Sequence, residues 1–347
     1  MIILGLETSC DETSAAIIEN NPNKKSVKIL SNIIATSLSI HAKTGGIIPE
    51  TAAREQLKFI IPVIEQALIE AKIINNKSSI INASSIDAIA VTYGPGLIGS
   101  LLVGVETAKT LSFVWKKPII PVNHLFGHIY ANFIGNNSIE FPAIALIVSG
   151  GHTDLVLIKN HGDIKWLGGT RDDAAGEAFD KIGRLLGLPY PGGPAIEKYA
   201  KKGNPKAFNF PRPMVSSDNF DFSFSGLKAA VFREVQIINN QSSIINVPDI
   251  CASVQEAVID VLVEKTLKAA QKYKAKSILL GGGVAANQKL RDELELNARR
   301  YLLDAKIFCP PKNLCTDNAA MIASAAFYNN KEMPWQKIMA DPELYFD

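Results

Sequence analysis

Short apolar runs separated by polar or glycine-rich segments predict strands that alternate with helices along most of the chain. Ile2–Leu6 and Ala15–Ile18 flank a polar, hydroxyl-rich loop, which is the pattern of a β-hairpin. Ala143–Val148 and Leu155–Ile158 repeat this pattern about 140 residues later, around the tip 149–154. The recurrence suggests an internal duplication with a cleft between the halves, although two hairpins can also be similar by chance.

Longer segments carry the spacing of helices, and Pro62 predicts a kink in the first of them. These helices are expected at Ala53–Ile74, Gly99–Val114, Cys251–Tyr273, Ala286–Arg300 and Asp317–Tyr328. Further strands are expected at Ile86–Thr92, Pro118–Val122 and Ser277–Leu280. The alternation indicates an α/β protein. The near-identical segments 73–82 and 237–246 are interpreted as polar loop insertions without chemistry of their own.

A chain of 347 residues is long for one hydrophobic core, so two lobes are expected, at residues 1–139 and 140–347. The final helix, 317–328, is rich in alanine and could pack on either lobe. The net charge of +2 neither indicates nor excludes a nucleic-acid binder with a local basic patch. Basic and aromatic residues that suit RNA gather in the second half, although the phenylalanines can equally be core: Lys198, Lys201, Lys202, Lys206, Arg212, Lys228 and Arg233, with Phe208, Phe210, Phe220, Phe222 and Phe224.

The cysteine pattern and the N-terminus bear on where the protein works. The four cysteines are scattered without a Cys-x-x-Cys pair, so a reducing cytosol is expected and a disulfide framework is not. The N-terminus lacks the basic region and the long apolar run of a signal peptide. No stretch approaches about 20 uninterrupted apolar residues, so no membrane span is expected.

His124 and His128 are the sharpest candidates for chemistry, because they are two of only five histidines. Asn123 follows an apolar run and is a good helix N-cap, and the residues after it have helical spacing. The two imidazoles then lie at i and i+4 on one helix face, where they could ligate one divalent metal ion. The equally weighted alternative is two polar residues that face solvent or cap loops.

Asp317 is a possible third ligand, and it would complete a set of two histidines and one carboxylate suited to Fe(II) or Zn(II). Taken alone, an Asp at this place is more often the N-cap of the helix that follows. The histidine spacing also matches the H-E-x-x-H motif of metalloproteases, but Leu125 stands where the general-base Glu is required. Metal-assisted peptide hydrolysis is therefore disfavoured.

Two glycine-rich loops could hold a phosphate or a nucleotide through backbone N–H groups. One loop is Ser149-Gly150-Gly151, and the other is Gly281–Asn287, ahead of a helix. Neither has the spacing of a Walker A loop or of a dinucleotide fingerprint. Asp180 is interpreted either as a surface partner of Arg184, four residues on, or as a contact to ribose hydroxyls.

The ordered set of motifs resembles the bacterial TsaD (Gcp) family, the tRNA N6-adenosine threonylcarbamoyltransferases. The set runs from Ile3 to about Tyr328 and comprises residues 6–13, 94–96, 123–128, 148–153, 179–181, 191–194, 222–228 and 281–287. The resemblance implies an actin-like, sugar-kinase-like fold, in which two ribonuclease-H-like lobes flank a central cleft. It also implies transfer of a threonylcarbamoyl group from threonylcarbamoyl-AMP to N6 of adenosine 37, in tRNAs that read ANN codons, with release of AMP.

The resemblance further implies ligands, cofactors and partners. It places one divalent metal ion per subunit, Fe²⁺ first and Zn²⁺ second, on His124, His128 and Asp317. It implies a cytoplasmic enzyme that works with the tRNA anticodon loop, a TsaB-like paralogue and a TsaE-like P-loop ATPase. The substrate-binding positions that it implies are Ile147, Val148, Ser149, Gly150, Gly151, Asp180, Gly193 and Asn287.

The implied reaction needs an acid/base group, because adenine N6 is a poor nucleophile. Asp11, at the tip of the first hairpin, is expected to fill this role with Glu12 as the reserve, although both acids could simply belong to a solvated turn. Two other functions compete with this interpretation. A secreted glycoprotein endopeptidase is disfavoured by Leu125 and by the missing signal peptide, and an actin-like ATP-binding module would have no need of two imidazoles at its cleft.

Overall fold

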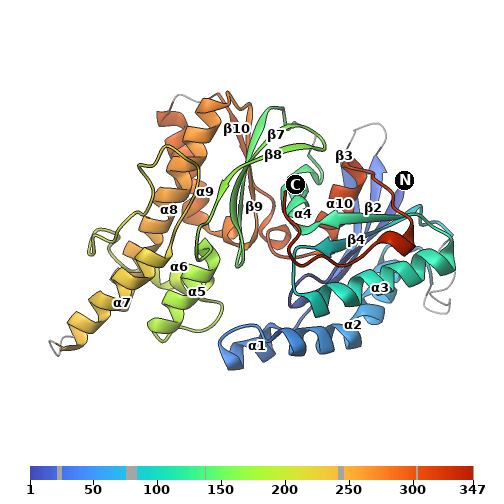
Figure 1. Cartoon of the computed structure of the whole chain (residues 1–347), viewed down its shortest axis with the longest axis horizontal. Coiled ribbons are helices and arrows are strands. Elements are labelled where there is room, and N and C mark those ends of the chain that lie inside the picture. The colour runs from blue at the N-terminus through green and yellow to red at the C-terminus, as the bar shows by residue number, and fades with distance from the viewer. Residues whose placement is uncertain (22–25, 76–83, 137, 241–245, 302–303, 347) are drawn as a thin grey trace. The chain divides into compact units, whose positions relative to one another are not determined.

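The structure is a computed structural model that describes residues 1–347 except 22–25, 76–83, 137, 241–245, 302–303 and 347. Large parts of the repeated segments 73–82 and 237–246 lie outside the described residues. The chain divides into two compact units (Figure 1). The first unit combines Met1–Ile139 with Pro310–Asp347, and the second is Glu140–Cys309. The C-terminal segment from residue 310 onward therefore belongs to the first unit.

The first unit contains a five-stranded mixed sheet with the order β3-β2-β1-β4-β5. Its strands are β1 (Ile2–Glu7), β2 (Glu12–Asn21), β3 (Ser26–Thr36), β4 (Ala88–Gly94) and β5 (Ile119–Asn123). The hairpin expected from the apolar pattern is β1–β2, and β3 continues it as a further antiparallel strand. On the other side, β1, β4 and β5 run parallel. The C-terminal ends of these three strands therefore share one edge of the sheet.

The second unit repeats this arrangement with the order β10-β9-β6-β7-β8. Its strands are β6 (Ala143–Val148), β7 (Thr153–Asn160), β8 (Asp163–Gly169), β9 (Ser277–Gly281) and β10 (Lys306–Phe308). The second expected hairpin is β6–β7, β8 continues it antiparallel, and β9 and β10 run parallel to β6. Because the two sheets agree in strand order and direction, the structure supports the internal duplication.

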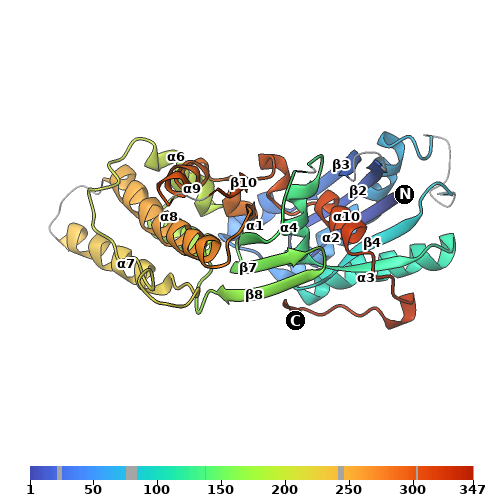
Figure 2. The same cartoon turned by 90° about the horizontal axis from the view of Figure 1, so that it is seen from above.

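Helices cover both faces of the first sheet. They are α1 (Leu38–Thr44), α2 (Pro49–Glu70), α3 (Ile98–Trp115), α4 (His124–Tyr130) and α10 (Ala319–Tyr328). Helices α2 and α3 lie side by side (Figure 1), and α10 lies beside α4 (Figure 2). Pro62 is inside α2, which begins and ends four residues earlier than expected. Short 3-10 turns complete the unit at Ala131–Phe133, Lys312–Leu314 and Trp335–Lys337.

Strand β1 shows how the two faces of the first sheet are filled. Leu4 and Leu6 are buried in the cluster that contains side chains of α2 and α3. Gly5, between them, points to the opposite face, because side chains alternate along a strand. A Cβ atom on Gly5 would stand 2.4 Å from the carbonyl oxygen of Ala319 in α10. A strand buried on both faces reads as a continuous apolar run, as this one does.

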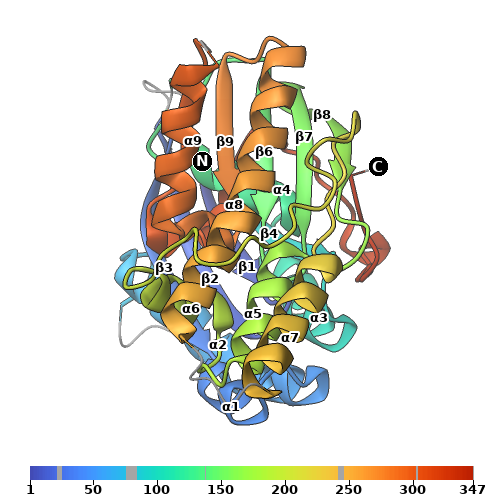
Figure 3. The same ribbon diagram turned by 90° about the vertical axis from the view of Figure 1, so that its left-hand side faces the viewer.

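The second sheet is covered by α5 (Ala175–Leu185), α6 (Gly192–Ala200), α7 (Ser225–Asn240), α8 (Val247–Lys272) and α9 (Gln288–Arg300), the last preceded by a 3-10 turn at Gly283–Ala286. Helix α8 packs against β6 and α9 (Figure 3). The aromatic side chains that could have suited RNA belong largely to this core, since four of them are buried: Phe210, Phe220, Phe222 and Phe224. Among the described helices, none combines the length and apolar character that crossing a membrane requires.

Candidate metal centre

Helix α4 begins where β5 ends, and Asn123 joins the two elements as the sequence predicts. Its side-chain oxygen accepts a hydrogen bond from the Leu125 N–H at 2.8 Å, and its amide group donates to the carbonyl of Tyr345 at 2.6 Å. This N-cap fixes the first turn of α4. Gly127 lies on the face of α4 that contacts α10, where a Cβ would be 2.7 Å from Cδ1 of Ile322. The first turns of α4 are therefore held close to α10.

Asp317 lies just ahead of α10, and it is not the helix cap. Asn318 is the N-cap, and its side chain accepts a hydrogen bond from the Met321 N–H at 3.1 Å. The helix start is tied to β2, because the Ala319 N–H donates to Oγ of Ser14 at 2.9 Å. The capping interpretation of Asp317 is therefore wrong.

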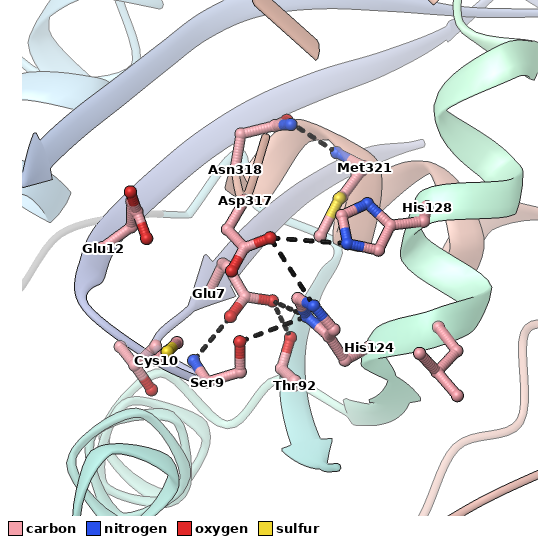
Figure 4. A network of polar contacts seen from close by, with 12 residues as sticks. Glu7, Ser9, Cys10, Glu12, Thr92, His124, His128, Asp317, Asn318 and Met321 are labelled. Carbon is pink, nitrogen blue, oxygen red and sulfur yellow. Dashed lines mark hydrogen bonds and ion pairs between the residues drawn. The ribbon is translucent and has the colours of Figure 1, made fainter. Parts of the chain in front are cut away.

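The structure brings His124, His128 and Asp317 together, as Figure 4 shows. Oδ1 of Asp317 lies 3.6 Å from Nε2 of His124 and 3.4 Å from Nε2 of His128. The two imidazole rings meet edge to face, with their centroids 4.7 Å apart. Both histidines are buried, so neither is the solvent-facing polar residue of the alternative interpretation, and the Asp317 side chain is 20% exposed. The carboxylate of Asp317 is therefore the most exposed of the three side chains.

The ring nitrogens of His128 are the strongest sign that a group is to be bound here. Neither Nδ1 nor Nε2 has a hydrogen-bond partner of normal geometry among the described residues, although both atoms are buried. Burial lowers the pKa of His128, so the imidazole stays neutral at neutral pH. A buried polar atom without a partner costs about 1–3 kcal/mol. A metal ion would satisfy Nε2, because it takes the lone pair of a neutral imidazole.

The chemistry and spacing of the three donors fit a divalent metal ion. Their ligand atoms all lie within 4.8 Å of one another. A tetrahedral ion with bonds of about 2.1 Å separates its ligand atoms by about 3.4 Å, close to the 3.4 Å and 3.6 Å found here. Imidazole nitrogen and carboxylate oxygen are ligands that suit iron and zinc.

Three residues near His124 were not predicted from the sequence to belong to the site: Glu7, Ser9 and Thr92. Glu7 ends β1, and Oε2 of its buried carboxylate lies 3.1 Å from Nδ1 of His124. Oγ of Ser9 lies 3.2 Å from the same nitrogen, and the Thr92 hydroxyl donates to Glu7 at 2.6 Å (Figure 4). Burial by itself lowers the pKa of His124, but the carboxylates of Glu7 and Asp317 outweigh it and raise this pKa to about 9. The sequence does contain one sign of this role for Glu7, because Glu7 is the acidic residue that ends the otherwise apolar strand β1.

The two acids of the first hairpin tip lie in the same unit. Asp11 is 8% exposed and therefore does not belong to a solvated turn. Burial, the charges of Asp317 and Asp11 and a hydrogen bond with Asp11 raise the pKa of Glu12 to about 10. Glu12 lies across Asp317 from the two histidines (Figure 4). Burial and the same carboxylates also raise the pKa of the Cys10 thiol, which therefore stays protonated and is a poor metal ligand.

The glycine-rich loops of the second unit meet at one edge of its sheet. Strands β6 and β9 are parallel neighbours, with Ile147 opposite Gly281, so the loops that follow them share an edge. Gly282 has φ +90°, and a Cβ there would be 2.4 Å from the carbonyl oxygen of Val148. The tip between β6 and β7 exposes Gly150 and Gly151, and nothing lies within 4 Å of their ideal Cβ positions. This carboxyl edge of parallel strands is where α/β proteins bind ligands.

The other three substrate-binding candidates are tied to the same region by hydrogen bonds. Asp180, in α5, accepts a hydrogen bond from the Gly192 N–H at 2.6 Å, so it holds the start of α6 beside Gly193 rather than pairing with Arg184. Burial raises the pKa of Asp180, although the N–H groups of Gly192 and Gly193 act in the opposite direction. Asn287 caps α9 through the Leu290 N–H at 3.1 Å. Internal bonds therefore account for the positions of both side chains.

Two units with matching strand order, the first carrying a His-His-Asp centre, define an actin-like, sugar-kinase-like α/β protein with a candidate metal site. Two solved HypF structures have this fold. Full-length HypF in its phosphate- and nucleotide-bound form covers 95% of this chain with a TM-score of 0.59, and the T. kodakarensis protein covers 94% with the same score. The alignments span 46% and 47% of the HypF chains at 12% and 14% identity, so this likeness concerns the fold alone.

The sequence comparisons identify the family. Residues 28–324 match the family described as TsaD: tRNA N6-adenosine threonylcarbamoyltransferase. The Moorella thermoacetica enzyme of this name is 50% identical over 94% of this chain and 91% of its own length. The Desulfitobacterium hafniense enzyme is 49% identical over 96% and 94%. The chain belongs to the TsaD family of tRNA N6-adenosine threonylcarbamoyltransferases, and it is a transferase.

The variant His128→Ala tests the metal centre directly, because the only polar contact of this imidazole among the described residues is the one with Asp317, another proposed ligand. We expect the purified wild-type chain, loaded with Fe²⁺ or Zn²⁺ and freed of excess metal, to keep about one equivalent by elemental analysis. The His128→Ala chain should keep close to none. The control is His161→Ala, which removes an exposed histidine of the second unit. Full metal retention by His128→Ala would refute the ligand assignment.

Proposed function

We propose that this chain transfers the threonylcarbamoyl group of threonylcarbamoyl-AMP to N6 of adenosine 37, in tRNAs that read ANN codons. The observation that carries the proposal is the His124-His128-Asp317 set, with two buried imidazoles whose Nε2 atoms face one carboxylate, in a member of the TsaD family. Peptide hydrolysis lacks support here, because Leu125 is fully buried and no general base stands in its place.

The proposed reaction exchanges one bond to the carbamoyl carbon for another. N6 of the adenosine forms a bond to this carbon, the bond to the phosphate oxygen breaks, and AMP leaves with the electron pair. The proton lost from N6 needs an acceptor. His124, His128 and Asp317 would hold a divalent ion, Fe²⁺ in preference to Zn²⁺, which would supply Lewis-acid chemistry to threonylcarbamoyl-AMP.

The second unit is proposed to hold the adenylate. The exposed backbone of Gly150 and Gly151 offers N–H groups to a phosphate, and the tight turn at Gly282 lies against Val148, near the end of β6 that leads into this tip. The proposed binding set also uses the backbone of residues 147–149 and the side chains or backbone at Asp180, Gly193 and Asn287. The shared carboxyl edge of β6 and β9 supports this assignment.

Asp11 is the proposed proton acceptor, with Glu12 beside it as a neutral hydrogen-bond donor. A carboxyl group whose pKa is raised to about 10 is protonated at neutral pH, and it cannot accept the N6 proton. Both acids are in the first unit with the metal centre. The carbonyl of Asp11 accepts hydrogen bonds from the N–H and the hydroxyl of Ser37, at 3.2 Å and 2.9 Å, which keeps this tip in place.

A TsaB-like paralogue and a TsaE-like ATPase are the proposed protein partners. Helices α2 and α3 expose large apolar side chains, among them Leu57, Ile61 and Leu102, and such side chains suit a protein interface. The four cysteines are free thiols, which agrees with a cytoplasmic site of action for a tRNA-modifying enzyme.

Four lysines near the end of α6 are the proposed contacts to the tRNA backbone. Lys198, Lys201, Lys202 and Lys206 are exposed, and none has an ion-pair partner among the described residues. Other basic groups of this half are already neutralised, as Lys228 is by Asp173. Helix α6 is about 13 Å long at 1.5 Å per residue, so Lys198 lies on the same short helix as Gly193, one of the proposed substrate-binding positions.

A reconstituted assay tests the proposed function. The purified chain and its two partners are incubated with threonylcarbamoyl-AMP and unmodified tRNA, and the products are digested to nucleosides. We expect threonylcarbamoyl-adenosine from tRNAs that read ANN codons, and none when adenosine 37 is replaced by guanosine. The Moorella thermoacetica relative serves as the positive control. If that relative is active and this chain forms no product, the transferase proposal fails.

Two variants distinguish the roles proposed for Asp11 and Glu12. Asp11→Asn should slow single-turnover transfer by about 10²–10⁴-fold, because it removes the proton acceptor. Glu12→Gln should slow it by less than about 10-fold, because the amide keeps a hydrogen-bond donor where a neutral carboxyl group stood. The rates are measured with saturating threonylcarbamoyl-AMP. A larger loss for Glu12→Gln than for Asp11→Asn would exchange the two roles.

The lysine contacts are tested by tRNA binding at several salt concentrations. The triple variant Lys201→Ala, Lys202→Ala, Lys206→Ala should bind tRNA more weakly, and the slope of log affinity against log salt should fall by roughly one unit per lysine. A triple variant of exposed lysines elsewhere in the unit, at Lys159, Lys165 and Lys274, is the charge-matched control. Equal losses in both triple variants would mean that net charge, rather than this surface, governs binding.

A further inference from the structure

Glu7 is a buried carboxylate that contacts three hydrogen-bond donors. It is 0% exposed at the end of β1. The Ser9 N–H donates to Oε1 at 2.5 Å, and the Thr92 hydroxyl donates to Oε2 at 2.6 Å. Nδ1 of His124 lies 3.1 Å from Oε2. Burying a charged group without water is costly unless it is hydrogen-bonded, and these three contacts satisfy that condition.

The contact with Glu7 assigns different tasks to the two nitrogens of His124. A carboxylate accepts hydrogen bonds, so Nδ1 carries the proton and points it at Oε2. Nε2 then lies on the other side of the ring, 3.6 Å from Oδ1 of Asp317, and it is the nitrogen that releases its proton when an ion binds. The ring orientation and the tautomer are therefore both set by Glu7. His128 has no such partner behind its ring, because its Nδ1 lacks a hydrogen bond among the described residues.

We propose that Glu7 is the positioning residue of the metal centre, which fixes Nε2 of His124 as a ligand before the ion arrives. This inference rests on the proposed metal site. A carboxylate behind a ligating imidazole raises the basicity of that ligand, and its loss typically weakens metal binding by about 10–100-fold. Thr92, on the neighbouring strand β4, in turn holds the carboxylate. Glu7 at the end of β1 thus orients the His124 ring, and Thr92 in β4 holds the Glu7 carboxylate in position.

The variant Glu7→Gln tests the proposal, because it keeps the size and shape of the side chain. Its NH₂ group must face one of three donors, so at least one of the three hydrogen bonds is lost. We expect the dissociation constant for Co²⁺, measured by chelator competition, to rise about 10–100-fold. The visible absorption of the Co²⁺-loaded chain should also change, while the far-ultraviolet circular dichroism of the metal-free chain should not. Thr92→Val should weaken Co²⁺ binding by a smaller factor, because the carboxylate remains.

Asp154→Asn is the matched control for loss of a buried charge. Asp154 is 1% exposed, lies in the second unit and accepts a hydrogen bond from the Trp166 indole N–H at 3.0 Å. Its Co²⁺ affinity should equal that of the wild-type chain. Co²⁺ binding by Glu7→Gln within twofold of wild type overturns the proposal, and so does unchanged binding by Thr92→Val if Glu7→Gln does not fold. A wild-type chain that binds no Co²⁺ overturns the metal site itself. This outcome differs from the one that overturns the role of Glu7, in which the wild-type chain binds Co²⁺ and the variant binds it equally well.

Discussion

Helix α10 approaches strand β1 so closely that glycine is required between them. A Cβ on Gly5 would stand 2.4 Å from the Ala319 carbonyl oxygen, too close for any side chain without moving the helix. This approach carries Asp317 to the imidazoles of α4, although the chain between them passes through the whole second unit. The candidate metal centre therefore depends on a packing contact between two ends of the sequence. Asp317 shares no local motif with the two histidines.

Each unit carries its candidate binding groups at the same place in its sheet, the edge where the parallel strands end. Parallel strands end at a common edge, and residues at or just after the strand ends provide the candidate binding groups. In the first unit this edge carries Glu7 and His124, and in the second unit it carries the glycine-rich turns after β6 and β9. Duplication of one fold unit thus provides two such edges, one with the candidate metal centre and one with the candidate phosphate-binding turns.

Local patterns allowed much of this structure to be predicted. The two hairpins, the N-cap at Asn123 and the helical pair of histidines follow from neighbouring residues, and the structure confirms them. Strand β3 was missed, because its sequence mixes polar and apolar residues without a clear period. The role of Asp317 could not be decided locally, since Asn318 is an equally good cap and only the packing of α10 separates them. Glu7 was missed because its partners come from β4 and α4.

The central claim is that both imidazoles and Asp317 bind one ion, with Glu7 behind His124. The most direct measurement is an anomalous difference map at the iron absorption edge, from crystals of the iron-loaded chain. The account predicts one strong peak about 2.0–2.2 Å from Nε2 of His124, Nε2 of His128 and a carboxylate oxygen of Asp317. A peak bonded to Nδ1 of His124, or one placed away from these three residues, would contradict it.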